Sequence, residues 1–177
     1  GGPGGYVCAI RLAQLGFNVA CIEKRKTLGG TCLNVGCIPS KALLESSEKM
    51  NEVKYSLSSH GIKIDNVEFD LHTMMLRKDK IVKDLCNGVS GLFKKNKITS
   101  FVGHAAFIGK NTIRITNDDG EEIVKSDKIV IATGSDIISL PNIKIDEKKM
   151  YRKKFQNIAK EVKNEREIVL QQVRHIS

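Results

Sequence analysis

Two thiols stand close together in the segment TCLNVGCIPSK, residues 31–41, where Cys32 and Cys37 are separated by four residues. A zinc site, a structural disulfide and a redox-active pair are the three chemistries that such thiols can serve. A loop this short is compatible with disulfide geometry. A structural zinc site usually takes two close pairs of ligands, and the chain has no second cysteine pair of this kind. The five cysteines are an odd number without a framework spacing, which argues against structural staples and for a reducing compartment.

The residues around the two thiols favour the redox role over a merely buried pair. Gly29, Gly30 and Gly36 predict a loop, and Pro39 suits the first turn of a helix that continues through SKALLESSEKM. Cys37 then lies at the helix N-terminus, where the helix dipole stabilises a thiolate. Lys41 lies four residues later, on the same helical face. We therefore expect the Cα atoms of Cys32 and Cys37 to lie about 4.4–6.8 Å apart.

A glycine-rich turn opens the chain, in GGPGGYVCAIRLAQLGFNVACIEK. Apolar residues at helical spacing follow it, Gly16 is placed to end that helix, and NVACIE reads as a short buried strand. The order of glycine turn, helix, strand and acid is typical of a dinucleotide-binding unit. In such a unit the glycines let the backbone approach a pyrophosphate, and the acid, here Glu23, accepts from ribose hydroxyls.

The middle of the chain predicts helical structure and then a group of strands. Residues 51–97 are charged and helical in pattern, with one broad apolar stripe in which Cys86 is a core residue; the stripe consists of Leu76, Ile81, Leu85, Val89, Leu92 and Phe93. After it, the alternation in TIRIT and the turn residues Asp119–Gly120 predict a small antiparallel meander. The meander is expected to lead into a buried strand, KIVIATG.

The net charge of +9 is concentrated near the end of the chain, because residues 144–177 carry ten Lys/Arg and five Asp/Glu. No nucleic-acid motif accompanies these charges, so a solvated basic segment is favoured over a nucleic-acid partner. No apolar run approaches the roughly 20 residues that span a membrane, so we expect no membrane partner.

Taken together, these motifs resemble the pyridine nucleotide-disulfide oxidoreductases, and GGTCLNVGCIPSKALL is most similar to the lipoamide dehydrogenase branch of that family. Mercuric reductases share much of the motif and are the nearest alternative. The resemblance covers about residues 1–147. It implies an α/β fold, namely a truncated Rossmann-like FAD-binding domain in which a parallel sheet with helices is joined by the small antiparallel meander. The chain begins inside the glycine turn, so the first strand of that domain is expected to be missing.

The resemblance also implies roles for individual residues. Cys37 would face the flavin, and Cys32 would be the outer thiol that exchanges with a dithiol substrate. Lys41 would lie beside the flavin ring, and Glu23 would bind the adenosine ribose. The full set of implied FAD-binding residues is Gly2, Gly4, Gly5, Glu23, Lys24, Gly30, Thr31, Cys32, Lys41, Ala105, Thr133, Gly134 and Ser135. No metal site is expected.

The implied reaction oxidises dihydrolipoamide to lipoamide and reduces NAD through FAD. The implied partners are the lipoyl groups of 2-oxo acid dehydrogenase complexes and, as in the family, a second copy of the enzyme. The domain that holds NAD in the complete enzyme is expected to be absent from these residues. A cytoplasmic location is expected, with the mitochondrial matrix as the alternative.

Residues 148–177 do not match the family pattern, and we expect a basic tail there that is helical or disordered. With the first strand and the later domains missing, the chain is expected to be inactive alone. The alternative interpretation is a non-catalytic gene remnant that binds flavin weakly.

Overall fold

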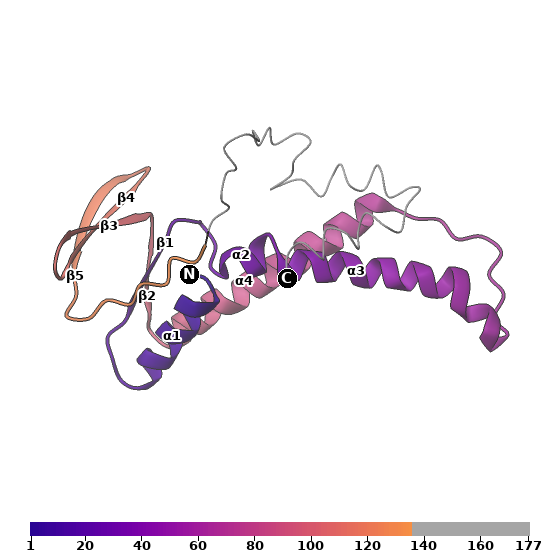
Figure 1. The fold of residues 1–177 in the computed structure, drawn as a ribbon, viewed down its shortest axis with the longest axis horizontal. Coiled ribbons are helices and arrows are strands. Elements are labelled where there is room, and N and C mark those ends of the chain that lie inside the picture. The colour runs from indigo at the N-terminus through magenta and orange to yellow at the C-terminus, as the bar shows by residue number, and fades with distance from the viewer. Residues whose placement is uncertain (136–177) are drawn as a thin grey trace. The chain divides into compact units, whose positions relative to one another are not determined.

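The structure is a computed structural model that describes residues 1–135 (Figure 1). The predicted basic tail, residues 148–177, lies outside the described residues. In chain order the elements are α1 (Pro3–Gln14), β1 (Ala20–Glu23), α2 (Gly30–Asn34), α3 (Cys37–Asn51), a π-helical turn (Glu52–Ser56), a 3-10 turn (Leu57–His60), α4 (Leu71–Lys95), β2 (Thr99–Val102), β3 (His104–Gly109), β4 (Thr112–Asn117) and β5 (Gly120–Lys125). The described residues form two units, residues 1–38 with 81–135 and residues 39–80.

In the first unit, α1 ends where the sequence predicts. Gly16 has a left-handed backbone, with φ of 89°. Its N–H donates to the carbonyl of Ala13 at 3.0 Å, and the N–H of Phe17 donates to the carbonyl of Leu12 at 3.2 Å. These two bonds form a Schellman cap, which satisfies carbonyls at the end of the helix and favours glycine at this position.

The parallel sheet of the first unit pairs β1 with β2, in the register Ala20↔Thr99 to Glu23↔Val102. Two strands can run parallel only when a crossover connects them. The parallel pair and the helices around it confirm the predicted α/β class, and the predicted strand NVACIE is present as β1.

The meander is also confirmed, because β4 pairs antiparallel with both β3 and β5. The turn between β4 and β5 is closed by Asn117, whose side-chain oxygen accepts from the N–H of Asp119 at 2.9 Å. Gly120 follows with φ of 133°. The polar residue and the glycine explain why the hairpin turns here.

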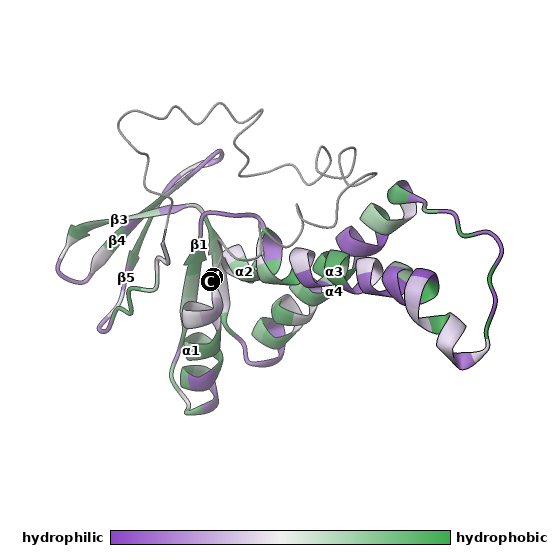
Figure 2. Cartoon of the chain, turned by 45° about the vertical axis from the view of Figure 1, so that its right-hand side comes forward, coloured by the Kyte–Doolittle hydropathy of each residue, from purple (hydrophilic) through white to green (hydrophobic). Residues whose placement is uncertain are grey.

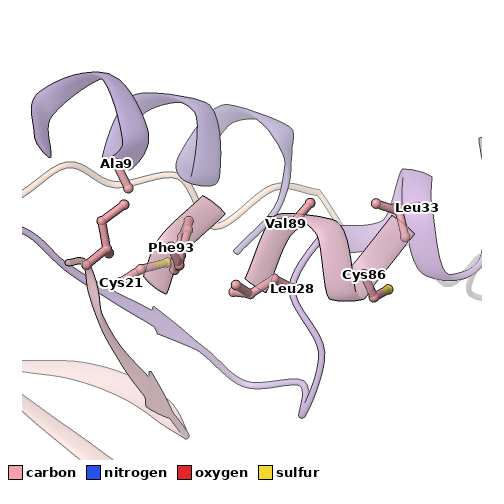
Figure 3. Close-up of a cluster of buried hydrophobic side chains, with 8 residues drawn as sticks. Ala9, Cys21, Leu28, Leu33, Cys86, Val89 and Phe93 are labelled. Atoms are coloured by element: carbon pink, nitrogen blue, oxygen red, sulfur yellow. The ribbon is translucent and has the colours of Figure 1, made fainter. Parts of the chain in front are cut away.

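The core of the first unit lies between α1, β1, α2 and the later turns of α4 (Figure 3). Its buried residues are Ala9, Cys21, Leu28, Leu33, Cys86, Val89, Phe93 and Ile98. Cys86 is 5% exposed, which confirms its assignment to the core. Phe93 is only 2% exposed.

The predicted apolar stripe of α4 is partly wrong. Leu76, Leu85 and Leu92 are 55%, 44% and 45% exposed. The residues of α4 that join the core are Val82, Cys86, Val89 and Phe93. These four follow the i, i+4, i+7, i+11 spacing of one narrow face, and the leucines lie to its side.

The predicted buried strand KIVIATG is also wrong, because residues 126–135 form no strand. Val130 and Ile131 are 61% and 70% exposed. A β-rich sequence becomes a strand only when a neighbour pairs with its backbone. Within the described residues β1 and β2 pair with each other.

The second unit contains most of α3 and the start of α4, and both helices carry alternating hydrophilic and hydrophobic residues (Figure 2). The guanidinium of Arg77 donates to the carbonyl of Ala42 at 3.1 Å and pairs with the Glu45 carboxylate. These contacts tie the second turn of α4 to α3. Asp70 caps α4, since its carboxylate accepts from the backbone N–H of Thr73 at 3.2 Å.

Candidate functional site

A disulfide joins Cys32 to Cys37, and their Cα atoms lie 4.7 Å apart. The predicted distance between these two Cα atoms is therefore confirmed. Cys32 lies in the short helix α2, and Cys37 is the first residue of α3. Both residues are partly exposed, so the pair is open to solvent.

The turn between the two cysteines is held by one carbonyl. The oxygen of Thr31 accepts from the N–H groups of Val35 and Gly36, at 3.0 and 2.9 Å. A Cβ at Gly36 would lie only 3.4 Å from that oxygen. The chain then enters α3 at Cys37, and Pro39 occupies the first turn, where the missing N–H leaves no helical bond unmade.

The side chain of Asn34 holds the loop that precedes Cys32. Its Nδ2 donates to the carbonyls of Leu28 and Gly30, at 3.1 and 2.9 Å. Its Oδ1 accepts from the Thr27 hydroxyl at 2.8 Å and from the Cys86 thiol at 3.4 Å. The sequence-based site set omitted Asn34. The available signal was an asparagine inside a glycine-rich loop, where its side chain commonly bonds nearby backbone groups.

The glycine turn contacts the cysteine loop through two backbones. A Cβ at Gly30 would lie 2.5 Å from the Cα of Gly2, so only glycine fits this approach. The N–H of Gly29 also donates to the carbonyl of Gly1 at 2.8 Å. The predicted residues Gly2 and Gly30 are therefore brought together at the start of α1, which has no side-chain cap, and Thr31 directly follows Gly30 in the chain.

Glu23 ends β1 beside this turn. Its carboxylate accepts from the backbone N–H of Arg25 at 2.9 Å and pairs with the Gly1 amine at 3.1 Å. Burial raises the pKa of Glu23, but the Arg25 N–H and the amine outweigh burial and hold the pKa below its ordinary value. The arrangement keeps the carboxylate ionised next to the glycine turn.

Two later segments also reach this region. A Cβ at Gly5 would lie 3.5 Å from the Cβ of Ala132, so the residues Thr133–Ser135 follow directly after a contact with α1. The N–H of Gly103 donates to the carbonyl of Glu23 at 3.0 Å, and Ala105 follows two residues later on β3. Both predicted cofactor segments thus start from contacts with the glycine turn or with Glu23.

The remaining predicted residues are not gathered in this way. Gly4 lies exposed in the first turn of α1, and Lys24 is exposed just after β1. Lys41 is exposed on α3 and belongs to the second unit.

A hollow of about 250 Å³ adjoins Glu23. Its cationic lining comes from Arg25, Lys26 and Lys94, and its aromatic lining comes from Phe93 and Phe101. Glu23 also lines this hollow and offers an acceptor for hydroxyl groups.

Two further observations concern residues 1–135. None of their helices has the length and apolarity needed to cross a membrane. No group of three or more His, Cys, Asp or Glu side chains in that range is arranged to hold a metal ion.

Comparison with known proteins identifies the family. The sequence model of the family described as pyridine nucleotide-disulphide oxidoreductase matches residues 1–174. The chain belongs to this family. The match extends past residue 147, and the predicted boundary there stays a prediction because residues 136–177 are outside the described part.

Among relatives in the family, the chain is 58% identical over 151 residues to the mitochondrial dihydrolipoyl dehydrogenase of Pisum sativum and 56% identical to a leghemoglobin reductase of Vigna unguiculata. The first alignment covers 85% of this chain and 30% of the pea enzyme, so the chain spans less than a third of that relative. The fold matches the HOCl-induced flavoprotein disulfide reductase RclA of Escherichia coli, in its Cu(II) complex, with a TM-score of 0.65 and 28% identity. That match covers 79% of this chain and 28% of the reductase.

Proposed function

We propose that these residues supply the flavin-binding and thiol-exchange part of a dihydrolipoyl dehydrogenase, which oxidises dihydrolipoamide and reduces NAD. The observation that carries the proposal is the closed Cys32–Cys37 disulfide, in a loop whose Gly30 lies against Gly2 of the glycine turn. The high identity to dihydrolipoyl dehydrogenases favours a lipoyl substrate over mercuric ion.

The residues present fit FAD. Gly2 and Gly30 meet through their backbones, so no side chain of either residue fills the space there. α1 begins at this point without a side-chain cap. Such a helix start offers N–H groups and partial positive charge to a pyrophosphate. Gly2, Gly4 and Gly5 would hold the pyrophosphate, and Glu23 would accept from the adenosine ribose.

The other proposed contacts are assigned by the resemblance. Lys24, Gly30, Thr31 and Cys32 would line the cofactor, and Ala105 would meet its adenine end. Thr133, Gly134, Ser135 and Lys41 would lie toward the flavin ring. When bound, FAD supplies an acceptor for two electrons, which NAD then takes up as hydride.

The chemistry of the chain itself is thiol–disulfide exchange. A thiolate of dihydrolipoamide attacks the Sγ of Cys32, the Cys32–Cys37 bond breaks, and Cys37 leaves as a thiolate. The second thiolate of the substrate then attacks the substrate sulfur bound to Cys32, which releases lipoamide and the Cys32 thiolate. The two thiol protons of the substrate balance the two new cysteine thiols.

Cys37 is suited to be the leaving group in the first step. It is the first residue of the 15-residue helix α3, whose N-terminal dipole stabilises a thiolate. Lys41, four residues later in the helix, adds positive charge. A stabilised leaving thiolate speeds exchange.

The names of the plant relatives favour a mitochondrial location over the cytoplasm. The partners follow from the substrate: a lipoyl group carried by a 2-oxo acid dehydrogenase complex, and a second copy of the enzyme. NAD would be the final electron acceptor of the complete enzyme.

Anaerobic reduction of the FAD-loaded chain tests the proposal. Dihydrolipoamide should bleach the visible flavin absorbance of the wild type and should leave that of Cys32→Ser unchanged at equal FAD occupancy. Cys8→Ser is the matched control, because it removes another partly exposed thiol. Equal bleaching of the wild type and Cys32→Ser would refute the role of the disulfide.

A further inference from the structure

We propose that Asn34 is a positioning residue that sets the redox equilibrium of the Cys32–Cys37 pair, by fixing α2 against the loop that precedes it and against α4. The inference rests on the proposed function, because it takes the disulfide to open and close. It concerns a residue that touches neither cysteine through a hydrogen bond.

The Asn34 side chain uses all of its principal hydrogen-bonding groups. Its amide nitrogen donates to the carbonyls of Leu28 and Gly30, and its oxygen accepts from the Thr27 hydroxyl and the Cys86 thiol. Two carbonyls on one side and two donors on the other fix which end of the amide is nitrogen. Asn34 is therefore held in a single orientation two residues after Cys32.

This network connects the disulfide to buried structure. Leu28 is 9% exposed, and Cys86 is 5% exposed in the core on α4. Burial also raises the pKa of the Cys86 thiol, which keeps its proton available for the bond to Asn34. Gly30, the second carbonyl partner, lies against Gly2. Asn34 thus anchors α2 to Thr27 and Leu28 in the loop before it and to Cys86 on α4.

The consequence appears when the disulfide opens. After reduction only the hydrogen bonds and packing of α2 keep Cys32 close to Cys37. A rigid α2 therefore raises the effective concentration of one thiol at the other and favours closure. Loosening α2 would lower that concentration and make the disulfide easier to reduce.

Asn34→Asp tests this with little change in shape, because an ionised carboxylate accepts but cannot donate to the Leu28 and Gly30 carbonyls. The full chain is equilibrated with mixtures of reduced and oxidised dithiothreitol. Free thiols are then alkylated, and mass spectrometry of the peptide that contains Cys32 and Cys37 gives the ratio of dithiol to disulfide. We expect the ratio at a given buffer to rise about fivefold, or roughly 20 mV for this two-electron couple. Circular dichroism under the same conditions checks that each variant is folded.

Asn96→Asp is the matched control, because Asn96 also donates to a carbonyl, that of Leu92 at 2.8 Å, outside the cysteine loop. It should leave the ratio within about 1.5-fold of the wild type. Thr27→Val removes one exposed hydroxyl donor to Asn34 and should shift the ratio about twofold in the same direction. If Asn34→Asp does not fold, Thr27→Val decides.

The two hypotheses fail differently. A wild-type disulfide that dithiothreitol opens only after the chain is unfolded would defeat the proposed function. A wild-type pair that titrates normally, with Asn34→Asp and Thr27→Val no different from Asn96→Asp, would overturn the role of Asn34 and leave the proposed function standing.

Discussion

Replacing Gly30 by alanine should be among the most damaging single-methyl changes in the first unit. Gly30 has φ of 62°, and a Cβ there would lie 2.5 Å from the Cα of Gly2 and 3.3 Å from the Cδ of Pro3. The left-handed conformation costs an alanine about 1–2 kcal/mol. Forcing apart two packed backbones costs about 1–3 kcal/mol more. The expected loss of about 2–5 kcal/mol is a large share of a total stability of about 5–15 kcal/mol.

Gly16→Ala separates the two contributions. Gly16 also has a left-handed backbone, with φ of 89°, but nothing lies within 4 Å of the position that its Cβ would take. We therefore expect a loss of only about 1–2 kcal/mol for this variant. The reduced freedom of the unfolded chain affects both substitutions alike and cancels in the comparison.

Urea unfolding followed by circular dichroism measures the free energy of unfolding of both variants, and quenching of FAD fluorescence measures cofactor affinity. Gly30→Ala should lose more stability than Gly16→Ala and should also weaken FAD binding, because Gly2 must move. Equal losses in the two variants, with unchanged FAD affinity in both, would refute the close contact between the glycine turn and the cysteine loop.

Three further results are expected. The pKa of Glu23 is depressed in the folded chain, so its ionisation stabilises the fold above the ordinary pKa of 4.5. In acid titrations of unfolding, the stability advantage of the wild type over Glu23→Gln should shrink as the pH falls below 4.5. A difference that does not change with pH would contradict the contacts of the Glu23 carboxylate. The pKa of Asp70 is lowered by the Thr73 hydroxyl and N–H, which both donate to its carboxylate. Asp70→Ala should therefore lower the helix content measured by circular dichroism more than Asp70→Asn does. The gap between the wild type and Asp70→Ala should narrow as the pH falls below 3.8, because protonated Asp70 keeps an acceptor and loses only its charge. In Cys37→Ser, the thiolate of Cys32 should attack the disulfide of oxidised lipoamide and form a mixed disulfide, which releases one lipoyl thiol. Alkylation of that thiol traps the adduct for mass spectrometry. An adduct found instead on Cys8 would contradict the assignment of Cys32 as the outer thiol.

The parts of the fold that local chemistry determines could be predicted from the sequence. Gly16 ends α1 because a glycine accepts positive φ there, and Pro39 marks the first turn of α3. The short spacing of Cys32 and Cys37, together with the glycines, Pro39 and Lys41 around them, led to the expectation that the two residues lie within disulfide reach. The alternation of TIRIT and the turn before Gly120 gave the meander.

The parts that depend on distant partners could not be predicted in the same way. KIVIATG has the composition of a strand, but a strand also needs a paired neighbour, and residues 126–135 form none. Helical spacing alone did not distinguish Leu85 and Leu92 from the buried Val89 and Phe93, because the choice depends on which face meets α1 and β1. The contact between Gly2 and Gly30 joins residues 28 positions apart, and no local pattern predicts it.

The candidate site shows the same division. The cysteines and the glycine turn carry strong local patterns. Asn34 was missed because its importance comes from four partners, of which Cys86 lies 52 residues away. The roles of the proposed FAD contacts, including Lys41 and Ala105, stay predictions.

The measurement that tests the central claim most directly is reversible reduction of the wild-type chain by its proposed substrate. The chain is equilibrated with mixtures of dihydrolipoamide and lipoamide, and each cysteine is then quantified by alkylation and peptide mass. Cys32 and Cys37 should gain label together as the dihydrolipoamide fraction rises and should lose it together when lipoamide is added. The labelling of the buried Cys21 and Cys86 should not change with the mixture. A Cys32–Cys37 pair that stays closed in every mixture, while the denatured chain is readily reduced, would contradict the account.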